Sequence, residues 1–225
     1  MKTVVITGAS RGIGLATAKK FLDEGWRVIG TYLNTPIPLE SEHLTGVHYD
    51  QSDSDSIAQF TAHVTEIAPK LDALVNNAGI NPDGRDEGVV LDKVRETFAV
   101  NLFGLMDVTE RLLPCMSSRS HIVNVDSNYG AFSFPIDDNT AVGYRLSKAA
   151  LNMYTRTLAF RLKDKGIVVS SIDPGWVKTD MGMSVASETD KPDREPEQPA
   201  REIYDLVTTN TETGCFWKFG KKREW

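Results

Sequence analysis

Cysteine is nearly absent from this sequence, which holds only Cys115 and Cys215. Neither belongs to a C-x-x-C pair, so we expect buried thiols in a reducing compartment rather than a disulfide framework. The four histidines are scattered, without the spacing of metal ligands. Asp50, Asp53 and Asp55 lack the glycine and the distal glutamate of a calcium loop, and helix capping explains Asp53 and Asp55 better. The sequence therefore predicts no metal centre.

Long apolar runs and an excess of positive charge are also missing. The first run, Val4–Ile6, is too short for the core of a signal peptide, and no later run could span a bilayer. The net charge of −6 gives no reason to expect nucleic acid or an anionic membrane as a partner. We therefore expect a cytoplasmic protein.

Short, nearly all-apolar runs alternate along the chain with longer segments of helical period. This alternation is typical of a parallel sheet covered by helices on both faces. The predicted strands are Lys2–Ile6, Arg27–Tyr32, Gly46–Tyr49, Leu71–Asn76, Ser120–Val125, Ile167–Asp173 and Cys215–Phe219. The predicted helices are Ile13–Glu24, Ser54–Ala68, Leu91–Leu113, Tyr144–Lys165 and Pro199–Thr208. With no repeat and no linker, residues 1–225 are predicted to form a single α/β domain, a three-layer, doubly wound parallel sheet.

One stretch differs in composition from the rest. Residues Ser187–Gln198 are rich in acidic residues and proline and can bury little surface, so we expect a mobile segment over about residues 181–199. It is either a plain loop or a lid on the substrate side of a pocket. Its shortness and polarity favour an open pocket.

A glycine-rich turn, Thr7–Gly14, directly follows the first strand and opens a helix. Glycine lets the backbone turn sharply and lets a pyrophosphate approach, while free N–H groups at the helix start attract its charge. In this strand–turn–helix context the turn indicates a dinucleotide-binding Rossmann fold. A nucleoside-triphosphate loop is disfavoured, because no Gly-Lys-Ser/Thr sequence closes the motif.

The spacing G-x-x-x-G-x-G of Gly8, Gly12 and Gly14 resembles that of the classical short-chain dehydrogenases/reductases. Further signatures of that family follow in order along the whole chain. They are Asn76–Gly79, Asn101, Ser127, the Y-x-x-x-K pair of Tyr144 and Lys148, and Pro174–Thr179. The segments Gly143–Met153 and Pro174–Met181, with the ending around Thr213–Trp225, are most similar to the C-factor-like and carbonyl-reductase-like members.

The resemblance implies a set of site residues. The catalytic residues would be Asn101, Ser127, Tyr144 and Lys148. The cofactor-binding residues would be Gly8, Ser10, Arg11, Gly12, Ile13, Gly14, Tyr32, Asp50, Asn77, Ala78, Gly79, Tyr144, Lys148, Pro174, Gly175, Val177 and Thr179. Within these sets Asp50 would bind adenine, Lys148 the nicotinamide ribose and Ser127 the substrate oxygen, while Asn101 would hold a water that links Lys148 to solvent.

Carbonyl reduction needs a proton for the developing alkoxide. An unperturbed tyrosine, with a pKa of about 10, is a poor proton shuttle at neutral pH, and a nearby ammonium lowers that value. Tyr144 and Lys148 are spaced i, i+4 and therefore share one helix face. We accordingly expect Lys148 to lower the pKa of Tyr144.

Two departures from the family pattern affect the substrate side. The family commonly has two serines after the fifth strand, and here the pair is Asp126-Ser127. We expect Asp126 to be structural, although a carboxylate there could perturb local pKa values. Ser127 also lies 17 positions before Tyr144, farther than is usual, because of extra residues in Phe132–Val142. This loop would edge the substrate pocket, so the family's substrates cannot be transferred to this chain.

The second strand ends Gly30–Asn34 without the carboxylate that binds the ribose 2′-hydroxyl in NAD-preferring folds. Arg11, inside the glycine turn, could instead pair with the 2′-phosphate of NADP(H), or could be a solvated surface charge. NADP(H) is therefore favoured over NAD(H).

The resulting hypothesis is an NADP(H)-dependent oxidoreductase of the EC 1.1.1 class that reduces a small-molecule carbonyl or oxidises the alcohol. A dinucleotide-binding signalling protein of the C-factor type, with little turnover, is the alternative. A sugar-nucleotide epimerase is disfavoured because the chain has no room for its larger substrate domain. By resemblance a homodimer or homotetramer is expected, formed through the helices beginning near Leu91 and Tyr144.

Overall fold

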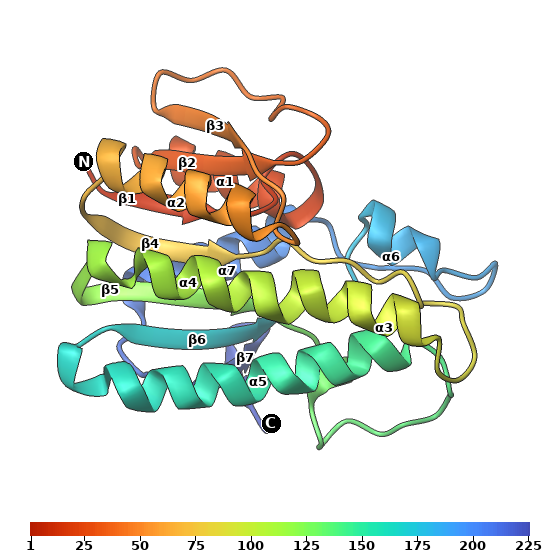
Figure 1. Ribbon diagram of the computed structural model, residues 1–225. Helices are drawn as coiled ribbons and strands as arrows, with labels where there is room; N and C mark the ends of the chain where they lie inside the picture. Colours follow the sequence, from red (N-terminus) through yellow and green to blue (C-terminus); the bar gives the residue numbers. More distant parts are fainter.

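The computed structural model describes all residues, 1–225, as one sheet with helices on both faces (Figure 1). The sheet has the order β3-β2-β1-β4-β5-β6-β7-β8 and is parallel except for β8. Its strands are β1 (Thr3–Ile6), β2 (Arg27–Tyr32), β3 (Leu44–His48), β4 (Leu71–Asn76), β5 (Met116–Val125), β6 (Val168–Asp173), β7 (Cys215–Lys218) and β8 (Lys221–Arg223). The predicted single domain with a doubly wound parallel sheet is confirmed.

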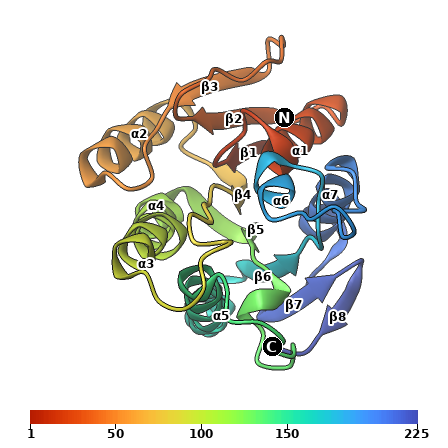
Figure 2. The same ribbon diagram turned by 90° about the vertical axis from the view of Figure 1, so that its right-hand side faces the viewer.

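The helices divide between the two faces of the sheet, as Figure 2 shows. They are α1 (Gly12–Asp23), α2 (Ser54–Ile67), α3 (Leu91–Phe98), α4 (Leu105–Leu112), α5 (Val142–Leu162), α6 (Asp180–Ser184) and α7 (Glu197–Thr209). Helices α1 and α7 cover one face, and α2, α4 and α5 cover the other. The short helix α6 lies over the carboxyl ends of the central strands. No helix carries an apolar stretch long enough to cross a membrane.

Alternation along the strands explains this two-sided core. Successive side chains of a strand point to opposite faces, so an all-apolar strand such as β1 needs a partner layer on each side. Val5 packs into the core beneath α2, α4 and α5, whereas Val4 and Ile6 pack into the core beneath α1 and α7. Burial of both faces is what the nearly continuous apolar runs predicted.

Three local features differ from the prediction. The long helix expected over Leu91–Leu113 is interrupted between α3 and α4 by a π-helical segment, Ala99–Gly104. Helix α6 and the antiparallel strand β8 were not predicted. Both are short, and a helix of five residues or a strand of three carries too little periodicity to be read from sequence.

Candidate functional site

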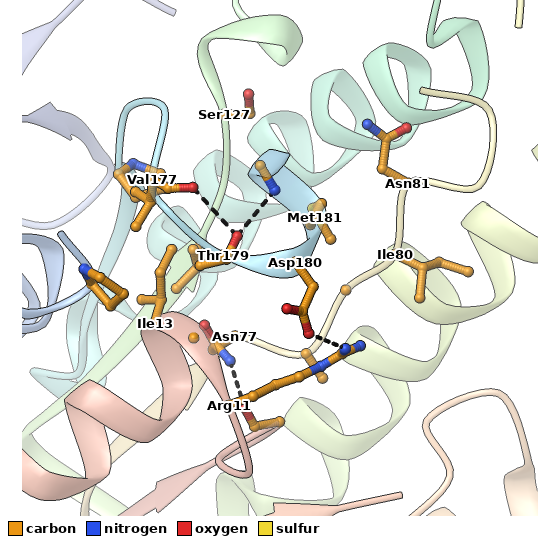
Figure 3. Close-up of a pocket in the computed structure, with 18 of the residues that line it drawn as sticks. Arg11, Ile13, Asn77, Ile80, Asn81, Ser127, Val177, Thr179, Asp180 and Met181 are labelled. Carbon is orange, nitrogen blue, oxygen red and sulfur yellow. Dashed lines mark hydrogen bonds and ion pairs between the residues drawn. The ribbon is translucent and has the colours of Figure 1, made fainter. Parts of the chain in front are cut away.

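A cleft of about 1190 Å³ opens at the carboxyl ends of the parallel strands. In open α/β sheets ligands bind at this edge. The cleft is lined by all of the predicted cofactor-binding residues except Gly14. Three of the four predicted catalytic residues, Ser127, Tyr144 and Lys148, also line it. Asn101 does not line it. Residues far apart in the sequence therefore meet in one cavity (Figure 3).

The glycine turn forms a cradle with unused N–H groups. Gly8 and Gly12 have φ angles of +69° and +54°, which favour glycine. Helix α1 begins at Gly12 without a side-chain cap, so its first N–H groups lack an acceptor inside the protein. Asn77 Nδ2 donates to the carbonyl of Gly8 at 3.0 Å and holds the turn against the end of β4. The turn therefore fits a pyrophosphate, and residues Thr7–Gly14 are called the phosphate turn below.

Gly14 acts through packing. A Cβ atom there would lie 2.0 Å from Gly8 O and 2.5 Å from Asn77 Nδ2. Only a glycine lets the first turn of α1 lie this close to the phosphate turn.

One end of the cleft is formed by the ends of β2 and β3. Tyr32 and Asp50 line it, and the carboxylate of Asp50 accepts hydrogen bonds from the N–H of Ser52 at 2.8 Å and its hydroxyl at 2.6 Å. Gln51, which sequence reasoning missed, is buried and donates to Ala78 O at 3.2 Å and Val100 O at 2.8 Å. It ties three segments together, and no local motif signals this role.

Arg11 is placed at the mouth of the cleft, where its Nη1 pairs with Asp180 at 2.5 Å (Figure 3). The two side chains are 77% and 74% exposed, so this ion pair contributes little free energy. The guanidinium is accordingly available to an anionic ligand that enters the cleft.

The turn after β6 closes the other end of the cleft. Gly175, with φ of +75°, follows Pro174, and Thr179 accepts a hydrogen bond from the N–H of Gly182 as the N-cap of α6. Arg194, which was not predicted, is buried, donates to Pro174 O and pairs with Glu202 at 2.5 Å. Its guanidinium lies 4.2 Å from the ring centroid of Phe219. Arg194 thus anchors the polar stretch 187–198 to this turn, while the mobility of residues 181–199 stays a prediction.

Ser127, Tyr144 and Lys148 meet where β5 ends beside the first turns of α5. Ser127 caps a short 3-10 turn, and its hydroxyl donates to Asn128 Oδ1 at 3.2 Å. It lines the same cleft as Tyr144. Lys148 is buried, and its Nζ donates to Val125 O at 2.8 Å. The same Nζ is 5.6 Å from the centroid of the Tyr144 ring, so the i, i+4 spacing does place both groups on one face.

The electrostatics differ from the prediction that Lys148 lowers the pKa of Tyr144. Burial raises the pKa of Tyr144, and the charge of Asp126 raises it further, against a lowering by the polar Ser127 side chain. Burial also lowers the pKa of Lys148. The ammonium is directed to the Val125 carbonyl rather than to the phenol oxygen, which explains why it does not offset the burial of the tyrosine.

Asn101 lies in the π-helical segment and is buried. Its Oδ1 accepts from Ile80 N at 2.8 Å, and its Nδ2 donates to Ile80 O at 2.9 Å and to Ser147 Oγ at 3.3 Å. Asn101 therefore bridges the segment after β4 to α5 one residue before Lys148. A π-bulge often marks a functional position in a helix. The water relay expected of Asn101 stays a prediction.

The long loop before α5 lines the outer part of the cleft, as predicted, through Phe134, Asp138 and Thr140. Arg145 holds the loop: it pairs with Asp138 at 3.0 Å, and its guanidinium carbon lies 4.1 Å from the centroid of the Tyr129 ring.

This geometry defines a class of protein: an oxidoreductase with an NAD(P)-binding Rossmann fold, whose dinucleotide cleft ends at a Ser–Tyr–Lys group. The family described as "short chain dehydrogenase" matches residues 2–190. The chain thus belongs to the short-chain dehydrogenase/reductase family, as the sequence indicated.

Two curated relatives are similar over most of their length. Serine 3-dehydrogenase of Agrobacterium fabrum is 33% identical over 184 residues, which cover 79% of this chain and 73% of the relative. Oxidoreductase UcpA of Salmonella typhimurium is 33% identical over 207 residues, which cover 86% of this chain and 76% of the relative.

Two solved structures share the fold. A short-chain dehydrogenase from Burkholderia cenocepacia in complex with NADP is 25% identical with a TM-score of 0.84, covering 96% of this chain and 95% of the other. An NADPH-bound carbonyl reductase from chicken fatty liver is 26% identical with a TM-score of 0.86, covering 100% and 99%. The narrower similarity to C-factor-like members stays a prediction.

Proposed function

We propose that this protein reduces a carbonyl group, or oxidises the corresponding alcohol, with NADP(H) as cofactor. The observation that carries the proposal is the meeting of Ser127, Tyr144 and Lys148 in the cleft that begins at the phosphate turn. When bound, NADPH supplies a hydride to the carbonyl carbon. The side chains of the protein supply the proton and orient the substrate.

Each side chain has a distinct task. Ser127 hydrogen-bonds the substrate oxygen and orients Tyr144. The phenol of Tyr144, kept protonated by its buried setting, donates its proton to the oxygen that becomes an alkoxide, and accepts it back in the oxidation direction. Lys148, buried beside the Tyr144 ring, would bind the ribose hydroxyls of the nicotinamide half of the cofactor. Met183, Val185 and Asp190, from the segment 181–199, line the cleft and would border the substrate.

Loss of NADPH absorbance with a panel of ketones, aldehydes and quinones tests the activity. Turnover of at least one carbonyl class, with formation of the alcohol, supports the proposal. Tight NADPH binding without turnover of any member would instead support a dinucleotide-binding signalling protein.

Replacing Arg11 by alanine is expected to raise KM for NADPH by about tenfold or more, because a charge-assisted contact with the 2′-phosphate is lost. KM for NADH should change little. The companion variant Asp180→Asn removes the competing carboxylate and should lower KM for NADPH. Steady-state kinetics with both cofactors make the comparison, and equal effects of Arg11→Ala on the two would contradict the NADP(H) preference.

An oligomer is proposed from an apolar stripe. Leu146, Met153 and Phe160 recur every seven residues on α5 and are 50%, 55% and 85% exposed. Phe103, on the neighbouring helical segment, is 60% exposed. Side chains seven apart share one helix face, and such a stripe is typical of a helix-to-helix interface between subunits.

Light scattering should therefore show a dimer or tetramer for the wild type. The variant Met153→Glu places a charge at the centre of the stripe and should dissociate it to monomers, whereas Lys165→Glu, beyond the end of α5, should not. A monomeric wild type would refute the interface.

A further inference from the structure

Asp126 is a buried carboxyl group directly before Ser127 that the reaction outlined above does not use. It is 2% exposed and forms no ion pair, unlike Asp173, which pairs with Lys218 at 2.8 Å and Arg223 at 3.1 Å. Its Oδ1 accepts from the N–H of Ser127 at 2.8 Å. An isolated buried carboxylate is costly, and such a group tends to keep its proton.

The hydrogen bonds beside Asp126 point to the same conclusion. The hydroxyl of Ser171 lies 3.2 Å from Asp126 Oδ2 and 3.1 Å from Asn152 Oδ1. Asn152 Nδ2 donates to Gly130 O at 3.1 Å, which fixes the amide orientation. A single hydroxyl proton cannot serve two acceptors. An ionised Asp126 would leave one of them unpaired in the core.

A protonated Asp126 completes the network. Its own hydroxyl donates to Ser171, whose proton then serves Asn152, whose amide serves Gly130. Every buried polar atom along this chain then has a partner. The burial of Asp126 raises its pKa to about 7, against lowering by the charge of Lys148 and by the hydrogen bonds from Ser127 and Ser171.

We propose that Asp126 carries a proton in the resting enzyme, and that its ionisation is coupled to that of Tyr144 and Lys148, so that it sets the pH range of the reaction. The coupling rests on the proposed acid–base function; the proton on Asp126 does not. Asp126 acts as a positioning residue.

The charged and titratable groups around Asp126 come from helix α5 and from strands β6, β7 and β8. Lys148 and Tyr144 face it from α5, and Asp173 faces it from β6 with its cations Lys218 and Arg223. Ionisation of Asp126 stabilises the ammonium of Lys148 and opposes the phenolate of Tyr144. In the oxidation direction Tyr144 must accept a proton. A charged Asp126 raises the pKa of Tyr144 and therefore shifts this activity to higher pH.

The first experiment measures the protonation without turnover. The variant Asp126→Asn keeps the hydrogen-bond pattern of a neutral carboxyl and cannot ionise. The unfolded chain releases the Asp126 proton at its ordinary pKa of 3.8, whereas the folded protein holds it to about 7. The folded state thus binds more protons in this window, so wild-type stability falls relative to the variant as pH rises.

Thermal melting is measured from about pH 4 to pH 8. The Tm of Asp126→Asn minus that of the wild type should increase as pH rises and become constant above about pH 7. The control Glu66→Gln removes an exposed carboxyl that forms no ion pair and should show no such change. Adding Lys148→Met to both proteins should make the Tm difference keep growing to a higher pH, because loss of the ammonium raises the pKa of Asp126 further. A constant Tm difference across the range would overturn the proton on Asp126, and an unmoved range with Lys148→Met would overturn the coupling.

The second experiment measures the pH profile of alcohol oxidation. With Asp126→Asn, and with Asp126→Ser, which restores the commoner residue of the family, the pH of half-maximal kcat/KM should fall by about one unit. A merely structural role would lower activity at every pH and leave the profile in place. If no alcohol or carbonyl is turned over at all, the proposed function fails, and the melting series still decides the protonation of Asp126.

Discussion

Replacement of Tyr144 by phenylalanine is expected to lower kcat for carbonyl reduction by about 10²–10⁴-fold, which is the usual contribution of a positioned general acid. The ring stays in place and only the proton donor is removed. Binding of NADPH should be retained, because the phosphate turn and the turn after β6 are untouched. Stopped-flow measurement of the hydride step, with NADPH titrated separately by fluorescence, makes the test.

Tyr129 provides a matched control for this variant. It also lines the cleft, and its ring packs edge-on against Tyr144 with a centroid distance of 6.3 Å. Tyr129→Phe removes an equivalent hydroxyl that the mechanism does not use, so kcat should change less than about tenfold. If Tyr144→Phe retained wild-type turnover, the mechanism proposed here would be wrong.

Substitution of Gly14 by alanine should abolish tight NADPH binding and destabilise the fold by about 1–3 kcal/mol, the usual cost of inserting an atom into a close-packed site. The new Cβ would overlap Gly8 O at 2.0 Å, so helix α1 must shift away from the phosphate turn. For a chain of this size the expected loss corresponds to a fall in Tm of roughly 2–12 °C. Calorimetry and NADPH titration measure the two effects.

The matched control is Gly25→Ala, at the other end of α1. Gly25 has a φ angle of +75° but no atom within 4 Å of an added Cβ. This variant should cost about 1–2 kcal/mol of backbone strain and leave NADPH affinity unchanged. Loss of affinity in both variants would mean that general destabilisation, and not the phosphate turn, controls binding.

The elements that position the cofactor were predictable because local chemistry determines them. An all-apolar strand followed by Gly8 and Gly12 has few alternatives to a tight turn into a helix. Tyr144 and Lys148 were placed on one face by helix geometry alone. Their protonation was not predictable, because it depends on the depth of burial and on Asp126, which lies on another element.

Other parts depend on contacts distant in sequence. The π-helical segment at Asn101 forms where that side chain bonds the backbone of Ile80, and no pattern within 91–113 records that partner. Arg194 lies in a stretch whose composition resembles a disordered loop, yet its burial against Pro174 and Glu202 orders the base of that stretch. Sequence composition describes a segment and not its surroundings.

The loop between Ser127 and Tyr144 connects two fixed elements, the end of β5 and the start of α5. Lengthening a surface loop costs little free energy, since the closure entropy grows only slowly with length. Residues 132–140 of this loop, beyond the turn that contacts Lys148 and Asn152, can therefore be exchanged or randomised while Ser127 and Tyr144 stay in position. In protein engineering, variants of this loop could be selected for a changed substrate range while the sequence of the phosphate turn is left unchanged.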